Sequence, residues 1–200
     1  MARSRLTDAD AAYLRYNYVT LAELCVERPE TPEQVERLIE QGLLPRPSYV
    51  LEDGTGYFPR DYFRLADEAG GPTELRASFV SRWHAARRAA QAPDELEQDW
   101  EVYLAGVWGV CLRDVTPETI VRKNDLVSSI CELLILARPN SPDWREALQA
   151  QVGELDALER QFTPDYDRGD AQERPPTRDL LIATARERYP EVFAEASTPA

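Results

Sequence analysis

The sequence predicts a mainly α-helical protein, with an N-terminal module that carries a β-hairpin and a C-terminal helical bundle. Three observations predict this fold class. Threonine or serine followed by proline or an acidic residue marks helix starts along the chain. Apolar residues recur at helical spacing after each of these starts. One Asp-Gly pair, Asp53-Gly54, separates two stretches of high β-propensity, which indicates a hairpin.

The N-terminal module is expected to span residues 1–70 and to combine short helices with the hairpin. Threonines that can cap a helix mark the starts, and prolines and glycines mark the breaks. The helices are expected to begin at Thr7-Asp8, Thr20, Thr31-Pro32 and Arg60, and the hairpin arms are residues 48–51 and 56–58. The first helix is expected to carry Tyr18. Gly70-Gly71-Pro72 then forms the clearest boundary in the chain.

The helical bundle is expected to span residues 73–193, with a flexible tail over residues 194–200. Its helices are expected to begin at Thr73, Pro93, Thr116-Pro117 and Ser141-Pro142, and a last helix carries Leu180 to Tyr189. The second of these is predicted as one helix over residues 94–112. Gly106 and Gly109 each cost ~1 kcal/mol there relative to alanine. With Ala105 they form a small-residue face that another helix or a ligand can approach. Whether the two parts share one core stays open.

The composition excludes several classes of function. The net charge is −13, with 43% apolar and 30% charged residues, which is typical of a globular protein that repels nucleic acid and anionic lipid. No apolar run approaches the ~20 residues that span a bilayer. The basic start, Met1–Thr7, is followed by acidic residues where a signal peptide would be apolar. We therefore expect a cytoplasmic protein without a membrane partner.

Cysteine and histidine usage indicates neither a disulfide framework nor a metal site. Cys25, Cys111 and Cys131 are widely spaced among apolar neighbours, as reduced thiols are. His84 is the single histidine, and C-x-x-C is absent from the sequence, so a zinc site of the usual kind is not expected. The sequence predicts no metal and no cofactor.

The segment from Thr20 to Leu65 has the order helix, turn, helix, hairpin, helix. Four strings in this segment carry a resemblance to a known module: Thr20-Leu21-Ala22-Glu23-Leu24, Thr31-Pro32-Glu33-Gln34-Val35, Gly42-Leu43-Leu44-Pro45 and Gly56-Tyr57-Phe58-Pro59-Arg60-Asp61-Tyr62. They resemble the winged helix-turn-helix module of MerR-type and excisionase-type DNA-binding proteins. The resemblance implies a winged-helix-like fold and DNA binding.

The charge of this module disagrees with DNA binding. Residues 1–75 hold eight arginines against fourteen acidic residues. The helix that would enter the major groove carries Glu33, Glu36 and Glu40 against Arg37, and glutamates repel the phosphates that flank the groove. We therefore interpret the module as a docking platform or as scaffold, with nucleic acid an improbable partner. The candidate partner-binding residues are Glu33, Glu36, Arg37, Glu40, Tyr49 and Tyr57.

The densest polar cluster joins two helices of the bundle, at residues 111–118 and 122–125. A helix start such as Thr116-Pro117 offers free N–H groups to an anion. The candidate ligand- or anion-binding residues are Tyr103, Cys111, Arg113, Glu118 and Lys123. The alternative is a capped interhelical turn with solvated ion pairs. No motif ties a nucleophile to His84, and catalytic residues are not identified.

Two further strings extend a resemblance over nearly the whole chain. One contains Tyr103, Gly106, Gly109-Val110-Cys111-Leu112, Val115-Thr116-Pro117-Glu118-Thr119-Ile120-Val121 and Lys123; the other contains Leu44-Pro45-Arg46-Pro47-Ser48-Tyr49-Val50, Asp53-Gly54-Thr55, Tyr57, Pro59 and Tyr62-Phe63. Together they resemble an uncharacterised bacterial family labelled as natural-product biosynthesis proteins. The resemblance implies a place in specialised metabolism and no defined reaction.

The leading functional hypothesis is an accessory protein of natural-product biosynthesis that binds a partner protein or a small metabolite. The second is a small cofactor-independent enzyme with its site near the junction at residues 111–123. The third is a MerR-like transcription regulator. The oligomeric state is not predicted.

Overall fold

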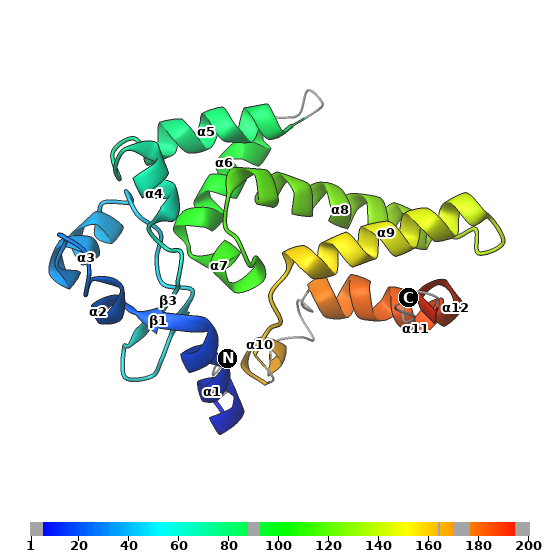
Figure 1. Cartoon of the computed structure of the whole chain (residues 1–200), viewed down its shortest axis with the longest axis horizontal. Helices are drawn as coiled ribbons and strands as arrows, with labels where there is room; N and C mark the ends of the chain where they lie inside the picture. Colours follow the sequence, from blue (N-terminus) through cyan, green and yellow to red (C-terminus); the bar gives the residue numbers. More distant parts are fainter. Residues whose placement is uncertain (1–5, 88–92, 164, 170–176, 195–200) are drawn as a thin grey trace.

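The computed structural model describes residues 6–87, 93–163, 165–169 and 177–194. In these residues the protein is mainly helical, with one three-stranded antiparallel sheet near the N-terminus (Figure 1). The mainly helical class predicted from the sequence is confirmed. Every described helix is too short or too polar to cross a membrane.

The N-terminal elements follow the predicted capping residues. They are α1 (Asp8–Asn17), β1 (Tyr18–Thr20), α2 (Leu21–Leu24), α3 (Pro32–Glu40), β2 (Tyr49–Val50), β3 (Gly56–Pro59) and α4 (Arg64–Ala69). The hydroxyl oxygens of Thr7, Thr20 and Thr31 each accept a hydrogen bond from the backbone N–H three residues later. The side chain of that later residue in turn accepts a hydrogen bond from the backbone N–H of the threonine. These reciprocal bonds satisfy backbone donors that the first turn leaves free, so the helices start where the sequence predicted.

The predicted hairpin is present, but the sheet has a strand that the sequence did not reveal. The strand order is β1-β3-β2, with Tyr49 opposite Tyr57 and Val19 opposite Phe58. Tyr18 was expected on the first helix and instead begins β1. The partner of β1 lies about forty residues further along the chain, so no local pattern reveals this pairing.

The remaining elements are helical. They are α5 (Leu75–Ala86), α6 (Pro93–Leu104), α7 (Val107–Cys111), α8 (Pro117–Ile135), α9 (Pro142–Leu158), α10 (Tyr166–Gly169), the π-helical segment η1 (Arg178–Ala183), α11 (Thr184–Arg188) and α12 (Pro190–Phe193). Thr116 and Ser141 cap α8 and α9 as predicted. The fourth predicted helix begins at Arg64 rather than Arg60, because Tyr62 N bonds Pro59 O in a turn. Of the predicted tail, residues 195–200 lie outside the described residues.

The prediction of one helix over residues 94–112 is wrong. The helix ends at Leu104, and Gly106 has φ +78°, a left-handed conformation that interrupts the helix before α7 begins at Val107. A Cβ on Gly106 would overlap the backbone carbonyls of Arg46 and Pro47. A Cβ on Gly109 would lie 2.7 Å from Pro59 Cγ. The small-residue face is therefore packed against the N-terminal chain, and the approaching segment is a loop rather than a helix.

One hydrophobic cluster lies on both sides of Gly70-Gly71-Pro72. Its members from the N-terminal side are Val35, Leu44, Phe58, Tyr62, Phe63, Leu65 and Ala66. They pack with buried residues of α5, α6, α7 and α8, among them Phe79, Trp83, Trp100 and Trp108. A second cluster joins α8 and α9 to η1, α11 and α12, which lie along them in Figure 1. The two parts of the chain thus share their first core.

Candidate functional site

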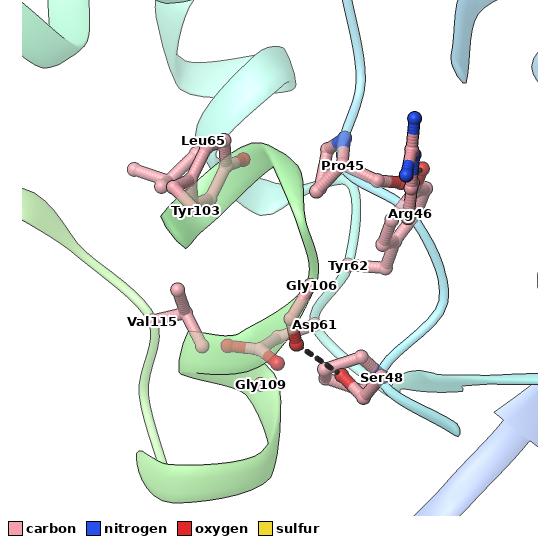
Figure 2. A pocket seen from close by; sticks show the side chains of 11 residues that line it. Pro45, Arg46, Ser48, Asp61, Tyr62, Leu65, Tyr103, Gly106, Gly109 and Val115 are labelled. Carbon is pink, nitrogen blue, oxygen red and sulfur yellow. Dashed lines mark hydrogen bonds between the residues drawn. The ribbon is translucent and has the colours of Figure 1, made fainter. Parts of the chain in front are cut away.

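The candidate site is a pocket where the N-terminal chain meets the α6–α7 break (Figure 2). Its cavity volume is about 30 Å³, and the space between the atoms reaches about 360 Å³ only when the open mouth is included. The lining consists of Pro45, Arg46, Ser48, Pro59, Asp61, Tyr62, Leu65, Tyr103, Gly106, Gly109 and Val115. It is called the joint pocket below. Of the residues predicted from sequence to bind a ligand, only Tyr103 belongs to this lining.

Backbone interactions hold the two walls of the joint pocket together. Arg46 N donates to Leu104 O at 2.8 Å, and Ser48 Oγ donates to Gly106 O at 2.9 Å (dashed in Figure 2). Leu104 is the last residue of α6, so its carbonyl has no donor within that helix, whereas Gly106 O also accepts from Gly109 N at 3.2 Å. The break between α6 and α7 therefore supplies two carbonyl acceptors, and these hold the loop that contains Arg46 and Ser48.

Two tyrosines of the joint pocket differ in how their hydroxyl groups are used. Tyr62 OH donates to Pro45 O at 2.6 Å. Tyr103 is 4% exposed, and its hydroxyl has no hydrogen-bond partner among the described residues. Burial raises the pKa of Tyr103, and the nearby Asp61 carboxylate raises it further. The ring of Tyr103 is buried, but its hydroxyl is not one of the described buried polar atoms that lack a partner, so it stays accessible.

Asp61 is the carboxylate of the joint pocket, and its ion pair is loose. Arg64 Nη2 lies 3.5 Å from Asp61 Oδ2, but Arg64 also reaches Asp114 at 3.1 Å and Glu68 at 3.9 Å. Arg82 in turn bonds both Glu68 and Glu118. Two guanidinium groups are therefore shared among four carboxylates, of which Asp61 is one.

The predicted junction site assembles only in part. Lys123 Nζ lies 3.0 Å from Glu159 Oε1, and both residues are buried. Cys111 adjoins this pair, since Lys123 interacts with its thiol and opposes the effect of burial, which raises the pKa of Cys111. Burial also raises the pKa of Glu159, against the attraction of Lys123. The positive charge of Lys123 is thus compensated by a carboxylate within the protein interior.

Arg113 and Glu118 do not join Cys111 and Lys123. Glu118 Oε1 accepts from Arg82 Nε at 2.8 Å on the outer side of the bundle, and Arg113 is exposed. The start of α8 is occupied by the side chains of Thr116 and Thr119, which cap each other's backbone. The structure therefore does not bring the five predicted residues to one anion site. It favours the alternative of a capped turn with solvated ion pairs.

The residues predicted to bind a partner are exposed with two exceptions. Glu33, Glu36, Arg37 and Glu40 lie on the exposed face of α3. Tyr57 is half-buried. Tyr49 is 5% exposed and donates from its hydroxyl to Asp167 Oδ2 at 2.8 Å, so it packs inside the molecule and is not part of a surface.

A buried carboxyl that the sequence analysis missed lies between three helices. Asp99 of α6 accepts from Trp83 Nε1 at 2.8 Å and from Asn124 Nδ2 at 3.1 Å. Burial raises the pKa of Asp99, and these two donors oppose that effect. In sequence Asp99 is one acidic residue among several on a polar helix, so no pattern singles it out. Its hydrogen bonds connect α5, α6 and α8.

The described residues contain no grouping of histidine, cysteine and carboxylate side chains suited to a metal ion. His84 is exposed on α5 and does not line the joint pocket.

Comparison with known proteins identifies a family and nothing more specific. The model of DUF6058, a family of unknown function, matches residues 75–190. No curated protein and no solved structure matches the chain. The matched range runs from α5 into α12, so one wall of the joint pocket lies inside it and the other outside. Because the match covers more than half of the chain, this protein belongs to DUF6058, a family of unknown function.

Proposed function

We propose that the protein binds a small metabolite in the joint pocket and acts as an accessory protein of specialised metabolism. One observation carries this proposal: the joint pocket contains the hydroxyl of Tyr103, which makes no hydrogen bond to a described residue and stays accessible. Ligand pockets are mostly apolar and hold a few polar groups. The joint pocket has this composition, and its cavity of about 30 Å³ limits what enters it to a small group of a ligand.

The N-terminal part of the proposal is a winged-helix-like module that serves as scaffold. The hairpin β2–β3 follows helices α2 and α3, as in a winged helix, and β1 completes its sheet. The loop between α3 and β2 forms a wall of the joint pocket. In this role the module closes a binding site instead of reading DNA.

DNA binding by the same module is the alternative proposal, and the charge of α3 argues against it. Its exposed Glu33, Glu36 and Glu40 would face phosphate groups if the helix entered a major groove. A gel-shift assay at low salt with promoter DNA separates the two proposals. We expect no shift, and a salt-dependent shift would favour the regulator.

A pair of matched variants tests metabolite binding. Val115 lines the joint pocket, whereas Val107 is 46% exposed on α7 outside the lining. We expect fragments from a library of small amines, alcohols and acids to raise the Tm of the wild-type protein. Val115→Phe fills the pocket and should abolish these shifts, while Val107→Phe should retain them. Circular dichroism of both variants checks that they fold.

Two results would count against the proposal. The first is a library in which no fragment raises the Tm of the wild-type protein. The second is equal fragment binding by folded Val115→Phe and Val107→Phe, which would place the ligand elsewhere.

A further inference from the structure

A second cavity lies between α6 and α8 and shares no lining residue with the joint pocket. It is called the α6–α8 groove below. Four residues of α6 from Glu95 to Val102 and four of α8 from Asn124 to Ser128 line it, together with Arg87 of α5 and Trp108 of α7. Its cavity volume is about 410 Å³, within the range of about 300–1,000 Å³ that ligand pockets have. The groove therefore has room for a small organic molecule.

The carboxylate of Asp99 lines this groove without a counter-ion. Asp99 is 5% exposed and forms no ion pair with a described residue. Its Oδ2 accepts from Trp83 Nε1 at 2.8 Å and from Asn124 Nδ2 at 3.2 Å, whereas its Oδ1 accepts from Asn124 Nδ2 alone, at 3.1 Å. Each carboxylate oxygen can accept about two hydrogen bonds. Oδ1 therefore keeps a free position for one more donor.

The cation of the described lining is already paired elsewhere. The side chain of Arg87 is 7% exposed, its Nη1 lies 2.5 Å from Glu95 Oε2, and its guanidinium lies 4.5 Å from the centre of the Trp83 ring. Its attraction lowers the pKa of Asp99, but burial outweighs it and raises that pKa. Asp125 is exposed and forms no ion pair with a described residue. The lining thus holds three carboxylates against one guanidinium.

The amide of Asn124 adds a free acceptor next to Asp99. An ionised carboxylate donates no hydrogen bond, so Asn124 must turn its Nδ2 toward Asp99. Asn124 Oδ1 belongs to the same amide, accepts from no described residue and is not buried. The indole N–H groups of Trp83 and Trp108 are both used, toward Asp99 Oδ2 and Asp99 O. Around Asp99 the groove therefore presents acceptors.

We infer that the α6–α8 groove binds a small organic cation of the amidine, guanidine or primary-amine class, with its N–H donors on Asp99 Oδ1 and Asn124 Oδ1. This assigns a second site, beyond the joint pocket. Such a cation compensates a carboxylate that the protein interior solvates poorly, and charge-assisted hydrogen bonds are about twice as strong as neutral ones. Val102, Val127 and Trp108 supply apolar surface for the body of the ligand.

Benzamidine, benzamide and benzoate test the assignment, because they share a ring and nearly the same shape but differ in charge. Isothermal titration calorimetry at neutral pH measures their binding to the full chain. We expect benzamidine to bind more tightly than benzamide by about tenfold or more, which corresponds to about 1.4 kcal/mol, and benzoate not to bind.

Asp99→Asn should reduce the affinity for benzamidine to that for benzamide. The variant is expected to fold, because asparagine still accepts from Trp83 Nε1 and the amide of Asn124 can turn to meet it. Glu101→Gln is the matched control. Glu101 is exposed on α6 outside the lining, so its substitution removes the same charge without touching the groove. Circular dichroism checks the fold of both variants.

A second pair of variants keeps the test sharp even if Asp99→Asn does not fold. Ser128 is exposed and lines the groove one turn after Asn124 on α8. Ser128→Lys brings a cation into the groove and should weaken benzamidine by about tenfold. Ser128→Glu adds a carboxylate at the same position and should not weaken it.

Equal binding of benzamidine and benzamide, tighter binding of benzoate, or no effect of both Asp99→Asn and Ser128→Lys would overturn the inference. Val115→Phe, which tests the joint pocket, should leave benzamidine binding unchanged. If it abolishes that binding, the cation lies in the joint pocket, so this inference is wrong while the proposed function stands. Alcohols and acids of the fragment library then report on the joint pocket independently of this groove.

Discussion

At the scale of single residues, Lys123 illustrates what a sequence can and cannot indicate. It is the one lysine in the chain, and it was selected as a candidate anion ligand. The structure places it 5% exposed beside Glu159, which no sequence pattern connected with it. A buried charge needs a partner because the protein interior solvates ions poorly. The burial of Lys123 is therefore accounted for by Glu159, without a bound anion.

Removing Lys123 should destabilise the fold far more than removing its neighbour. Lys123→Met leaves the Glu159 carboxylate buried without its counter-ion, and we expect a loss of about 3–5 kcal/mol in the free energy of unfolding. Arg122→Met is the matched control. Arg122 bonds Glu154 on the surface, both side chains are more than 40% exposed, and such pairs contribute about 0–1 kcal/mol.

Urea denaturation of the wild type and both variants measures these losses. The double variant Lys123→Met with Glu159→Leu should regain much of the stability, since no charge is then buried. Similar losses of unfolding free energy for Lys123→Met and Arg122→Met would show that the buried pair contributes no more to stability than the surface pair.

At the scale of elements, helix starts were predictable and helix interruptions were not. A cap such as Thr31 acts on residues within the next turn, so the start of a helix can be predicted from a short stretch of sequence. The interruption at Gly106 depends on Arg46 and Pro47, which approach from far away in the chain. From the sequence alone, Gly106 and Gly109 are residues that one continuous helix could tolerate, because the approach of the distant segment is not visible there.

Asp10 connects two elements, α1 and α10, and predicts a dependence on pH. Its carboxylate accepts from Asp165 N at 3.0 Å, from Tyr166 N at 3.2 Å and from Thr7 N at 2.9 Å. Burial opposes the ionisation of Asp10, but these backbone bonds and the Thr7 hydroxyl outweigh it and lower the pKa of Asp10 below the ordinary 3.8. The folded state therefore prefers the ionised form.

Asp10→Asn should cost about 1–3 kcal/mol at neutral pH, because an amide cannot replace both carboxylate oxygens as acceptors. A lowered pKa contributes stability that is complete above the unfolded value of 3.8 and is lost as the pH falls below it. The difference between wild type and variant should thus shrink in acid. Urea titrations at neutral pH and below 3.8 measure it, and a difference independent of pH would contradict the assignment.

At the scale of the whole molecule, the shared core leads us to expect that the two parts of the chain unfold as one unit. Phe58 of β3 packs in the same cluster as Trp83, Trp100 and Trp108. The joint at residues 70–72 is a boundary in the sequence, yet the packing continues across it. Figure 1 shows α4 of the N-terminal part leading directly onto α5.

Phe58→Ala should therefore lower the stability reported by distant tryptophans. The chain has four tryptophans, and all of them follow residue 70. We expect the variant to lose about 3–5 kcal/mol and to shift the tryptophan-fluorescence and circular-dichroism midpoints together. Tyr16→Ala is the control, since Tyr16 is 80% exposed. Two separate transitions, with tryptophan unaffected, would mean independent domains.

The sequence by itself determined the mainly helical class, most helix starts and the hairpin, because caps, prolines and the Asp-Gly turn act over a few residues. It also selected Tyr103 as a candidate, although as part of a different cluster. Only the tertiary structure decided the pairing of β1 with β3, the break at Gly106 and the partners of Asp61 and Lys123. Each of these depends on contacts between segments far apart in the chain. Such contacts are selected by packing and by the need to pair buried polar groups, and neither requirement leaves a local pattern.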